Sequence, residues 1–370
     1  MRLPLKNKED QESVDQEEVN KMVKTFMDNE YTYFDTAYPY HNGLSEKSLK
    51  KALVDKYPRD SFQLADKLPL FFITKEEQME SMFNEQLERC GVDYFDYYML
   101  HNVSKWTEKA FTDIDSFKFI LDKKAEGKIK HAGISYHDDA KFLENILKKH
   151  ANDIDFIQLQ INYIDWENDG IQAKECYELS CKYEIPVIVM EPLKGGSLVD
   201  IPKEAEKLFK EYNSERSNAG WALNYCQNLD NVFMVLSGVS NNEHVIDNIK
   251  NTNDFKKLTP KEYEIIDKVK NIINSSIAVT CTECGYCLET CPKNILISKF
   301  FALYNTEKRM PANGFSPQEV YYNTLTLKEE NGKASDCIEC NLCVEHCPQH
   351  LDIPKYLKDV TQLFEVDLVG

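Results

Sequence analysis

The chain has 370 residues, which at roughly 150 residues per domain corresponds to about two and a half domains, or to one large barrel with an appended domain. Hydrophobic residues make up 42% of the sequence and aromatic residues 11%, which is ample for a packed core and excludes a disordered or fibrous chain. Lysine and arginine number 44 against 62 aspartates and glutamates, and the net charge of -18 argues against nucleic acid or an anionic membrane as a partner.

The sequence contains no segment typical of membrane insertion or secretion. No apolar run approaches the roughly 20 residues that cross a bilayer. The first residues, MRLPLKNKEDQ, lack the apolar core of a signal peptide. We therefore expect a cytoplasmic protein that does not associate with a membrane.

Short apolar runs alternate with amphipathic stretches from about residue 15 to residue 273, and this pattern predicts repeated β/α units around a parallel sheet. The predicted strands are residues 31–35, 62–65, 95–100, 131–134, 154–160, 186–190 and 232–236. Seven such units are one short of the eight-stranded (β/α)8, or TIM, barrel, which is the α/β fold that we expect.

The strand that is lacking would have to precede the first helix, where residues 1–5 are the available apolar segment. Either the chain begins inside strand one, or the barrel is open or patched by another segment, and we favour the first interpretation. A doubly wound sheet of seven strands is the alternative fold. It is less favoured because no glycine-rich GxGxxG turn follows an early strand.

Polar side chains stand where successive predicted strands end, which is where a barrel enzyme places its chemistry. Asp35, Lys67 and His101 end three strands, and Tyr40 follows five residues after Asp35. Singly, the aspartate could be a helix cap, the lysine a solvated loop charge and the histidine a core group. Their recurrence at neighbouring strand ends instead indicates a catalytic site.

These four residue types suit the reduction of a carbonyl group. Hydride delivery leaves negative charge on the oxygen, so a positioned acid must donate a proton. A tyrosine pKa of about 10 is high for this role, and we expect Lys67 to lower the pKa of Tyr40 while Asp35 holds the lysine in place. A neutral His101 could donate a hydrogen bond that orients the carbonyl.

The residues resemble the aldo/keto reductase family, in its bacterial branch with a C-terminal ferredoxin-like extension. The resemblance covers essentially the whole chain, and the family's catalytic tetrad falls on Asp35, Tyr40, Lys67 and His101. It is carried by the segments YTYFDTAYPYHNGLSEKSLKKAL, LADKLP, LERCGVDYFDYYMLHN, GKIKHAGISYHD, IQLQINYID, VIVMEPLKGGSL and VLSGVSNNEHVIDNI. It implies an NAD(P)-dependent oxidoreductase acting on a small carbonyl or alcohol substrate.

The resemblance also implies a site for the dinucleotide. Ser135 and Gln158 match positions that bind the carboxamide, and Met190 stands where many members stack an aromatic ring on the nicotinamide. The adenosine half would lie near Gly238, Ser240, His244 and Asn248. Well-studied members have a lysine and an arginine for the 2'-phosphate where this chain has Gly238 and His244, so NADH is at least as strongly expected as NADPH.

Eight of the twelve cysteines fall near the C-terminus, in two runs that both read C-x2-C-x2-C-x3-C-P. This spacing is typical of bacterial ferredoxins, in which three thiolates hold one [4Fe-4S] cluster and the fourth reaches the other cluster. Zinc, which is usually announced by separated CxxC pairs, and disulfides in a cytosolic chain are the weaker alternatives. The predicted ligands are Cys281, Cys284, Cys287 and Cys291, with Cys337, Cys340, Cys343 and Cys347.

The cysteine runs predict two domains, a barrel over residues 1–274 and a small helical ferredoxin-like iron–sulfur domain over residues 275–370. Residues 297–309, 316–327 and 353–364 are amphipathic and predict the helices of the second domain. Glu30 stands where the family usually has a glycine with a left-handed backbone.

Two hypotheses for the function remain open. In the first, the barrel exchanges hydride with a carbonyl or alcohol, and the clusters exchange single electrons with a ferredoxin or a flavin. In the second, the chain is a dinucleotide-binding redox sensor or an electron-transfer protein with little turnover. The complete quartet favours the enzyme, because a pure sensor has no use for an acid tyrosine.

Overall fold

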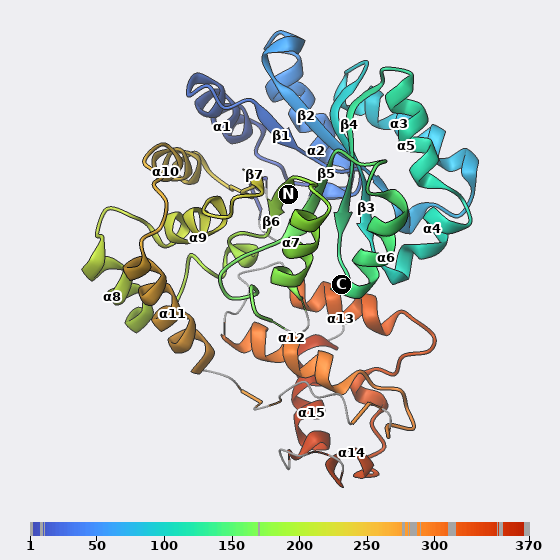
Figure 1. The fold of residues 1–370 in the computed structure, drawn as a ribbon, viewed down its shortest axis with the longest axis vertical. Helices are drawn as coiled ribbons and strands as arrows, with labels where there is room; N and C mark the ends of the chain where they lie inside the picture. Colours follow the sequence, from blue (N-terminus) through green and yellow to red (C-terminus); the bar gives the residue numbers. More distant parts are fainter. Residues whose placement is uncertain are drawn as a thin grey trace. The chain divides into compact units, whose positions relative to one another are not determined.

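The structure is a computed structural model that describes residues 3–7, 10, 12–168, 171–275, 278–279, 281, 287–288, 290–309, 316–345, 347 and 351–365. Two compact units divide the chain (Figure 1). The first unit comprises Met1–Leu193 and Ala219–Thr259, and the second comprises Lys194–Asn218 and Pro260–Gly370.

A parallel sheet of seven strands in sequential order forms the centre of the first unit, and it confirms the seven predicted strands (Figure 1). The order places the carboxyl ends of all strands at one edge, because every neighbouring pair is parallel. The strands are β1 (Tyr33–Asp35), β2 (Gln63–Pro69), β3 (Phe95–Val103), β4 (Ile129–Tyr136), β5 (Phe156–Gln160), β6 (Val187–Met190) and β7 (Val232–Val235).

Helices connect successive strands, and several of them begin at a side chain that caps the helix. Asp15 accepts hydrogen bonds from the backbone N–H groups of Glu17 and Glu18 at the start of the first helix. Asp139 caps a later helix in the same way, by accepting from Phe142 N–H. The helices of this unit are α1 (Gln16–Asp28), α2 (Leu44–Leu49), α3 (Glu76–Cys90), α4 (Glu108–Thr112), α5 (Ser116–Ala125), α6 (Ala140–His150), α7 (Ala173–Lys182), α9 (Asn218–Gln227) and α10 (Asn242–Asn253).

The interior of the sheet is filled by apolar side chains from β2, β3, β5 and β6. Ala65, Met99, Phe156 and Ile188 are buried together there. Gly133 on β4 has no side chain because a Cβ atom would lie 2.6 Å from the carbonyl oxygen of Phe156 on the next strand. Glycine at this position lets β4 approach the first residue of β5 closely.

The described residues contain no eighth strand and no ladder between β1 and β7, so the sheet is open by one strand. Leu5 forms an isolated antiparallel bridge with Val14 and does not extend the sheet in the described part of the chain.

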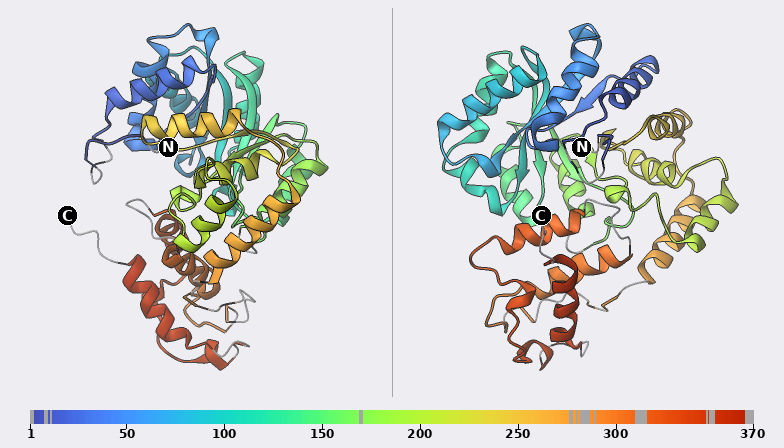
Figure 2. Two further views of the ribbon diagram at one scale, coloured as in Figure 1. Left: turned by 90° about the vertical axis from the view of Figure 1, so that its left-hand side faces the viewer. Right: turned by 180° about the vertical axis from the view of Figure 1, so that it is seen from behind.

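The helices α1 and α10 lie against each other on the outside of the sheet, with Met22, Val245 and Ile249 buried between them (Figure 2).

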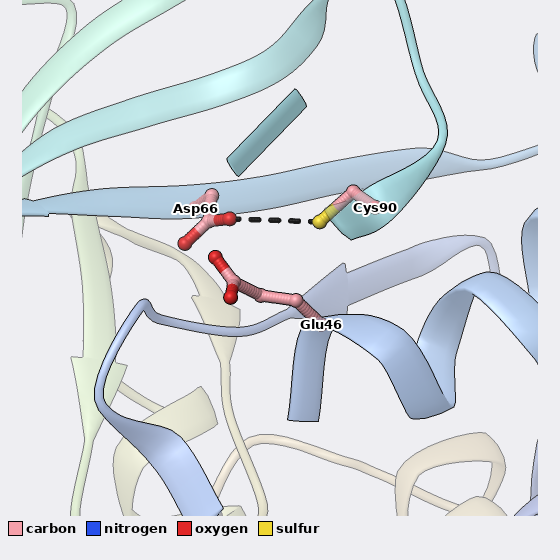
Figure 3. A group of neighbouring side chains, drawn as sticks. All are labelled: Glu46, Asp66 and Cys90. Carbon is pink, nitrogen blue, oxygen red and sulfur yellow. Dashed lines mark hydrogen bonds between the residues drawn. The ribbon is translucent and has the colours of Figure 1, made fainter. Parts of the chain in front are cut away.

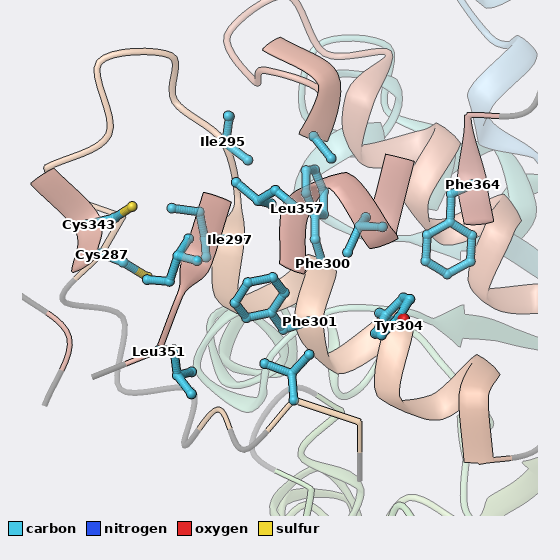
Figure 4. Packing of buried hydrophobic residues seen from close by; sticks show 14 of the residues in the cluster. Cys287, Ile295, Ile297, Phe300, Phe301, Tyr304, Cys343, Leu351, Leu357 and Phe364 are labelled. Carbon is cyan, nitrogen blue, oxygen red and sulfur yellow. The ribbon is translucent and has the colours of Figure 1, made fainter. Parts of the chain in front are cut away.

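The second unit is helical, and its helices are α8 (Lys203–Tyr212), α11 (Pro260–Ser275), α12 (Ile297–Arg309), α13 (Pro317–Thr326), α14 (Leu342–Glu345) and α15 (Ile353–Phe364). Among these, α12, α13 and α15 begin and end close to the bounds predicted for them. Phe300, Phe301 and Tyr322 form the buried centre of this unit together with Leu357 and Phe364 of α15 (Figure 4). No helix among the described residues combines the length and the apolar composition that crossing a membrane requires.

Candidate active site

Lys67 on β2 is the centre of the candidate site, and its side chain is 1% exposed. Its Nζ atom donates to Oδ1 of Asp35 at 2.5 Å and to the carbonyl oxygen of Thr36 at 2.7 Å. Burial lowers the pKa of Lys67, but the negative charge of Asp35 and the hydrogen bond that the ammonium donates to it outweigh this effect and raise the pKa above its usual value. The lysine is therefore a fixed buried cation at the ends of two neighbouring strands.

Tyr40 lies directly beside this cation, with Lys67 Nζ 5.1 Å from the centre of its ring. Burial raises the pKa of Tyr40, whereas the charge of Lys67 lowers it. We expected the lysine to dominate, but burial is the larger effect, and the net shift is upward. Tyr40 therefore keeps its proton at neutral pH.

The backbone that follows Tyr40 is held in an unusual conformation. His41 has φ 51°, Asn42 has φ 52° and Gly43 has φ 81°, so three successive residues occupy the left-handed region. Such a conformation is unfavourable for residues other than glycine and occurs often at functional sites.

Glu30, which follows α1, was predicted to stand at a left-handed position, and its φ is 64°.

His101 at the end of β3 completes the group. Its ring packs edge-on against Tyr40, with the ring centres 5.9 Å apart and an interplanar angle of 88°. Burial and the charge of Lys67 hold the pKa of His101 well below its usual value, so the imidazole is neutral, as we expected. Its Nδ1 atom is buried without a hydrogen-bond partner among the described residues.

The structure thus brings the four predicted catalytic residues together. It adds His137, which the sequence analysis missed, with its Nε2 atom 3.0 Å from Oγ of Ser135. Burial and then the charge of Lys67 lower the pKa of His137 to about 4. The sequence feature that could have identified His137 is its position two residues after Ser135, immediately after strand β4.

The residues predicted to hold the nicotinamide lie on neighbouring strands. Ser135 on β4 pairs in register with Gln158 on β5, and the Oγ atom of Ser135 lies 3.8 Å from Sδ of Met190. Gln158 is 2% exposed, and its Nε2 atom has no hydrogen-bond partner within the described ranges. A buried amide donor that needs an acceptor, next to a serine hydroxyl, fits the carboxamide of a nicotinamide.

The residues predicted to lie near the adenosine half surround the first turn of α10. Gly238, Ser240 and His244 are exposed, and Nδ1 of His244 lies 3.4 Å from Oγ of Ser240. Asn248, one α-helical turn after His244, donates to Oγ of Ser237 at 2.8 Å. This group offers neutral hydrogen-bonding side chains and the N-terminal end of a helix, which favours an anionic ligand.

The cysteines of the two runs come together in the second unit. Cys287 and Cys343 are each 7% exposed and lie at the same end of its apolar core (Figure 4). Burial and then the thiols of Cys337, Cys291 and Cys340 raise the pKa of Cys343 to about 11. Cys337, Cys340 and Cys343 belong to the second run, and Cys291 belongs to the first. A set of three cysteines from one run and one from the other fits the ligand pattern of a [4Fe-4S] cluster. Cys284 lies outside the described residues.

Comparisons with known proteins match the two parts of the chain to two families. The aldo/keto reductase family matches residues 4–271, and the 4Fe-4S dicluster domain matches residues 280–352. An aldo-keto reductase of Mycobacterium avium is 26% identical over 253 residues, which are 68% of this chain and 81% of that protein. A component of the ion-translocating oxidoreductase complex of Buchnera aphidicola is 29% identical over 112 residues, which are 27% of this chain, but the match spans only 20% of that relative's length.

Solved structures of aldo-keto reductases share the fold. The holo form of an aldo-keto reductase from Bacillus halodurans has a TM-score of 0.57 at 22% identity, and the match covers 72% of this chain and 91% of that one. An aldo/keto reductase of Klebsiella pneumoniae, in complex with NADP and acetate, has a TM-score of 0.57 at 19% identity and covers 69% and 86%.

Proposed function

Because the chain belongs to the aldo/keto reductase family, we propose that it is an NAD(P)-dependent oxidoreductase that transfers hydride to or from a small carbonyl or alcohol, with Tyr40 as the acid. The observation that carries the proposal is the contact of one buried ammonium, Lys67, with both Asp35 and Tyr40. A lysine that only stabilised the fold would not require, at its side, a tyrosine whose hydroxyl can donate a proton.

The nicotinamide supplies or accepts the hydride when it is bound. Burial keeps Tyr40 protonated, so the hydroxyl is ready to donate to the substrate oxygen as charge develops there. Lys67 stabilises the phenolate that remains, and Asp35 keeps the ammonium in place. Neutral His101 orients the substrate oxygen through a hydrogen bond without adding a second positive charge.

Binding of the dinucleotide rests on two groups of residues. Ser135 and Gln158, which pair in register, would hold the carboxamide, and Met190, beside Ser135, would contact the nicotinamide ring. Gly238, Ser240, His244 and Asn248 at the start of α10 bind the adenosine half. NADH is accepted at least as well as NADPH, because none of these four side chains carries a fixed positive charge.

The cysteine unit holds two [4Fe-4S] clusters and exchanges single electrons with a ferredoxin or a flavin. The first cluster is bound by Cys281, Cys284, Cys287 and Cys347, and the second by Cys337, Cys340, Cys343 and Cys291. Cysteines in such number avoid disulfide formation and remain available as cluster ligands in a reducing compartment, which supports a cytoplasmic location.

The test of the catalytic assignment compares two tyrosines that are two residues apart. Tyr40→Phe removes the proposed acid, and we expect the rate of carbonyl reduction to fall by about 10²- to 10⁴-fold while the dinucleotide still binds. Tyr38→Phe is the control, because the Tyr38 hydroxyl donates to Glu85. Equal rates for wild type and Tyr40→Phe would reject the proposal.

A further inference from the structure

A second buried polar group lies behind the catalytic lysine. Consecutive side chains of a strand point to opposite faces, so Asp66 on β2 points away from the Lys67 ammonium and toward the helices. There it meets Glu46 of α2 and Cys90 of α3, and all three side chains are 0% exposed (Figure 3). The proposed catalytic mechanism uses none of them.

The three groups contact one another closely. One ligand atom from each residue lies within 4.8 Å of the others, and the Cys90 thiol lies 3.6 Å from Oδ2 of Asp66. Figure 3 shows the carboxyl groups of Glu46 and Asp66 facing each other. Arg89 donates to Oε2 of Glu46 at 3.0 Å, but Oε1 of Glu46 is buried with no hydrogen-bond partner in the described part of the chain.

The charges of this group do not balance if both carboxyls are ionised. Two carboxylates would face one guanidinium, Arg89, which also pairs with Glu85 at the surface. Burial in each case raises the pKa of the Cys90 thiol and of the Tyr98 hydroxyl, so these neighbours on α3 and β3 stay neutral. The ammonium of Lys67, on the other face of the strand, is paired with Asp35.

One proton held between the two carboxyl groups accounts both for the unpaired Oε1 atom of Glu46 and for the unbalanced negative charge. We propose that Asp66 keeps its proton near neutral pH and donates it to the unpaired Oε1 of Glu46. Burial and then the charge of Glu46 raise the pKa of Asp66 well above its usual value. A proton fits better than a metal ion, because a proton leaves the bond between Arg89 and Glu46 intact and needs no entry path to a site with 0% exposure.

Asp66 also fixes the backbone of Lys67, together with Gln86 of α3. The Lys67 N–H donates to Oδ1 of Asp66 at 2.8 Å, and the Lys67 carbonyl oxygen accepts from Nε2 of Gln86 at 3.0 Å. Gln86 is fixed in turn by Tyr98, whose hydroxyl donates to its Oε1 at 2.6 Å. Asp66 is therefore a positioning residue for Lys67, a role that rests on the proposed function.

Infrared difference spectroscopy tests the proton directly, without reference to activity. Wild-type protein at neutral pH should show the carbonyl band of a protonated carboxylic acid, which shifts in deuterated water and is absent in Asp66→Asn. Asp93→Asn, a change at an exposed aspartate, is the control and should retain the band. A spectrum of Asp66→Asn that matches wild type in this region would overturn the proposal. So would a stoichiometric metal ion in wild type that Asp66→Asn lacks.

The pH dependence tests the positioning role. The folded state binds one proton more than the unfolded state above the usual aspartate pKa, so wild type should lose stability relative to Asp66→Asn as the pH rises. The alkaline decline of kcat should begin at higher pH in Asp66→Asn. If the stability difference follows this course but the kcat profiles coincide, the positioning role is wrong and the shared proton stands. If Tyr40→Phe is fully active, the proposed function fails while the infrared result still decides the proton.

A second variant covers the case in which Asp66→Asn does not fold. Glu46→Gln removes the negative charge beside Asp66 but keeps the shape of the side chain. The infrared band should then disappear at lower pH than in wild type, because the Asp66 carboxylate no longer faces another anion. A band that titrates at the wild-type pH in Glu46→Gln would contradict the shared proton.

Discussion

Lys67 Nζ lies 2.5 Å from Oδ1 of Asp35, and the side chains are 1% and 17% exposed. Removal of one member of such a buried pair leaves the other charge uncompensated, whereas removal of both does not. The pair therefore contributes to stability and to catalysis in ways that mutations can separate.

Lys67→Met should lower the free energy of unfolding by about 3 kcal/mol and reduce kcat/KM by about 10²- to 10⁴-fold. The double variant Lys67→Met/Asp35→Asn should recover most of the stability and none of the activity. Urea unfolding and steady-state kinetics on the three proteins check this. Recovery of activity in the double variant would contradict the role of Lys67 beside Tyr40.

The two histidines beside Lys67, His101 and His137, predict a stability that decreases in acid. The pKa of His101 lies well below its usual value, and the pKa of His137 is about 4, so both are neutral in the folded protein. The unfolded chain takes up protons as the pH falls below about 6.5, and stability should decrease by up to about 1.4 kcal/mol per pH unit for each histidine. His137→Gln should flatten this decrease. Urea unfolding at a series of pH values measures it, and equal slopes would refute the neutral state of His137.

The crossed arrangement of cysteines predicts which variants damage the same cluster. Cys291→Ser should alter the electron paramagnetic resonance signal that Cys337→Ser alters, because we propose that both residues bind the second cluster. Cys287→Ser should alter the other signal. Wild type prepared without oxygen should hold about eight iron and eight sulfide ions per chain. Identical spectra for Cys291→Ser and Cys287→Ser would argue against the crossing.

The loop before α10 predicts weak discrimination between the two dinucleotides. Ser240 Oγ and His244 Nδ1 lie 3.4 Å apart, and this group contains no lysine or arginine, so it suits a ribose hydroxyl better than a desolvated phosphate. We expect NADH to bind as tightly as NADPH or more tightly near pH 8. Fluorescence titration of both dinucleotides measures this, and a strong preference for NADPH that is unchanged in His244→Ala would show that other residues bind the 2'-phosphate.

The strands, and the grouping of Asp35, Tyr40, Lys67 and His101 at their ends, could be predicted because each signal is local. Asp35, Lys67 and His101 each end an apolar run, and parallel strands place such ends together. The direction of the Tyr40 pKa could not be predicted in this way, because it depends on how deeply the ring is buried. Sequence gives the neighbours of a side chain along the chain, but burial is set by the packing of several elements.

The group formed by Glu46, Asp66 and Cys90 could not be predicted from the sequence, for a related reason. Asp66 looks like an ordinary polar residue within LADKLP, and the pattern shows only that it points to the face opposite Lys67. Its contacts with Glu46 and Cys90 depend on the placement of α2 and α3 against the sheet. The number of shared protons is a property of that arrangement and of no single residue.

The packing of α1 against α10 has a consequence for how the protein is made. Thr25 donates to Asn242, Asn242 N–H donates to Glu18 and Tyr31 donates to Asn253, so these bonds join residues that are 217, 224 and 222 positions apart. Contacts between such distant residues form slowly, because a long loop must close before they contribute. On the ribosome, α1 emerges long before its partner exists. The part of its apolar face that packs against α10, around Met22, then stays uncovered until α10 has left the exit tunnel.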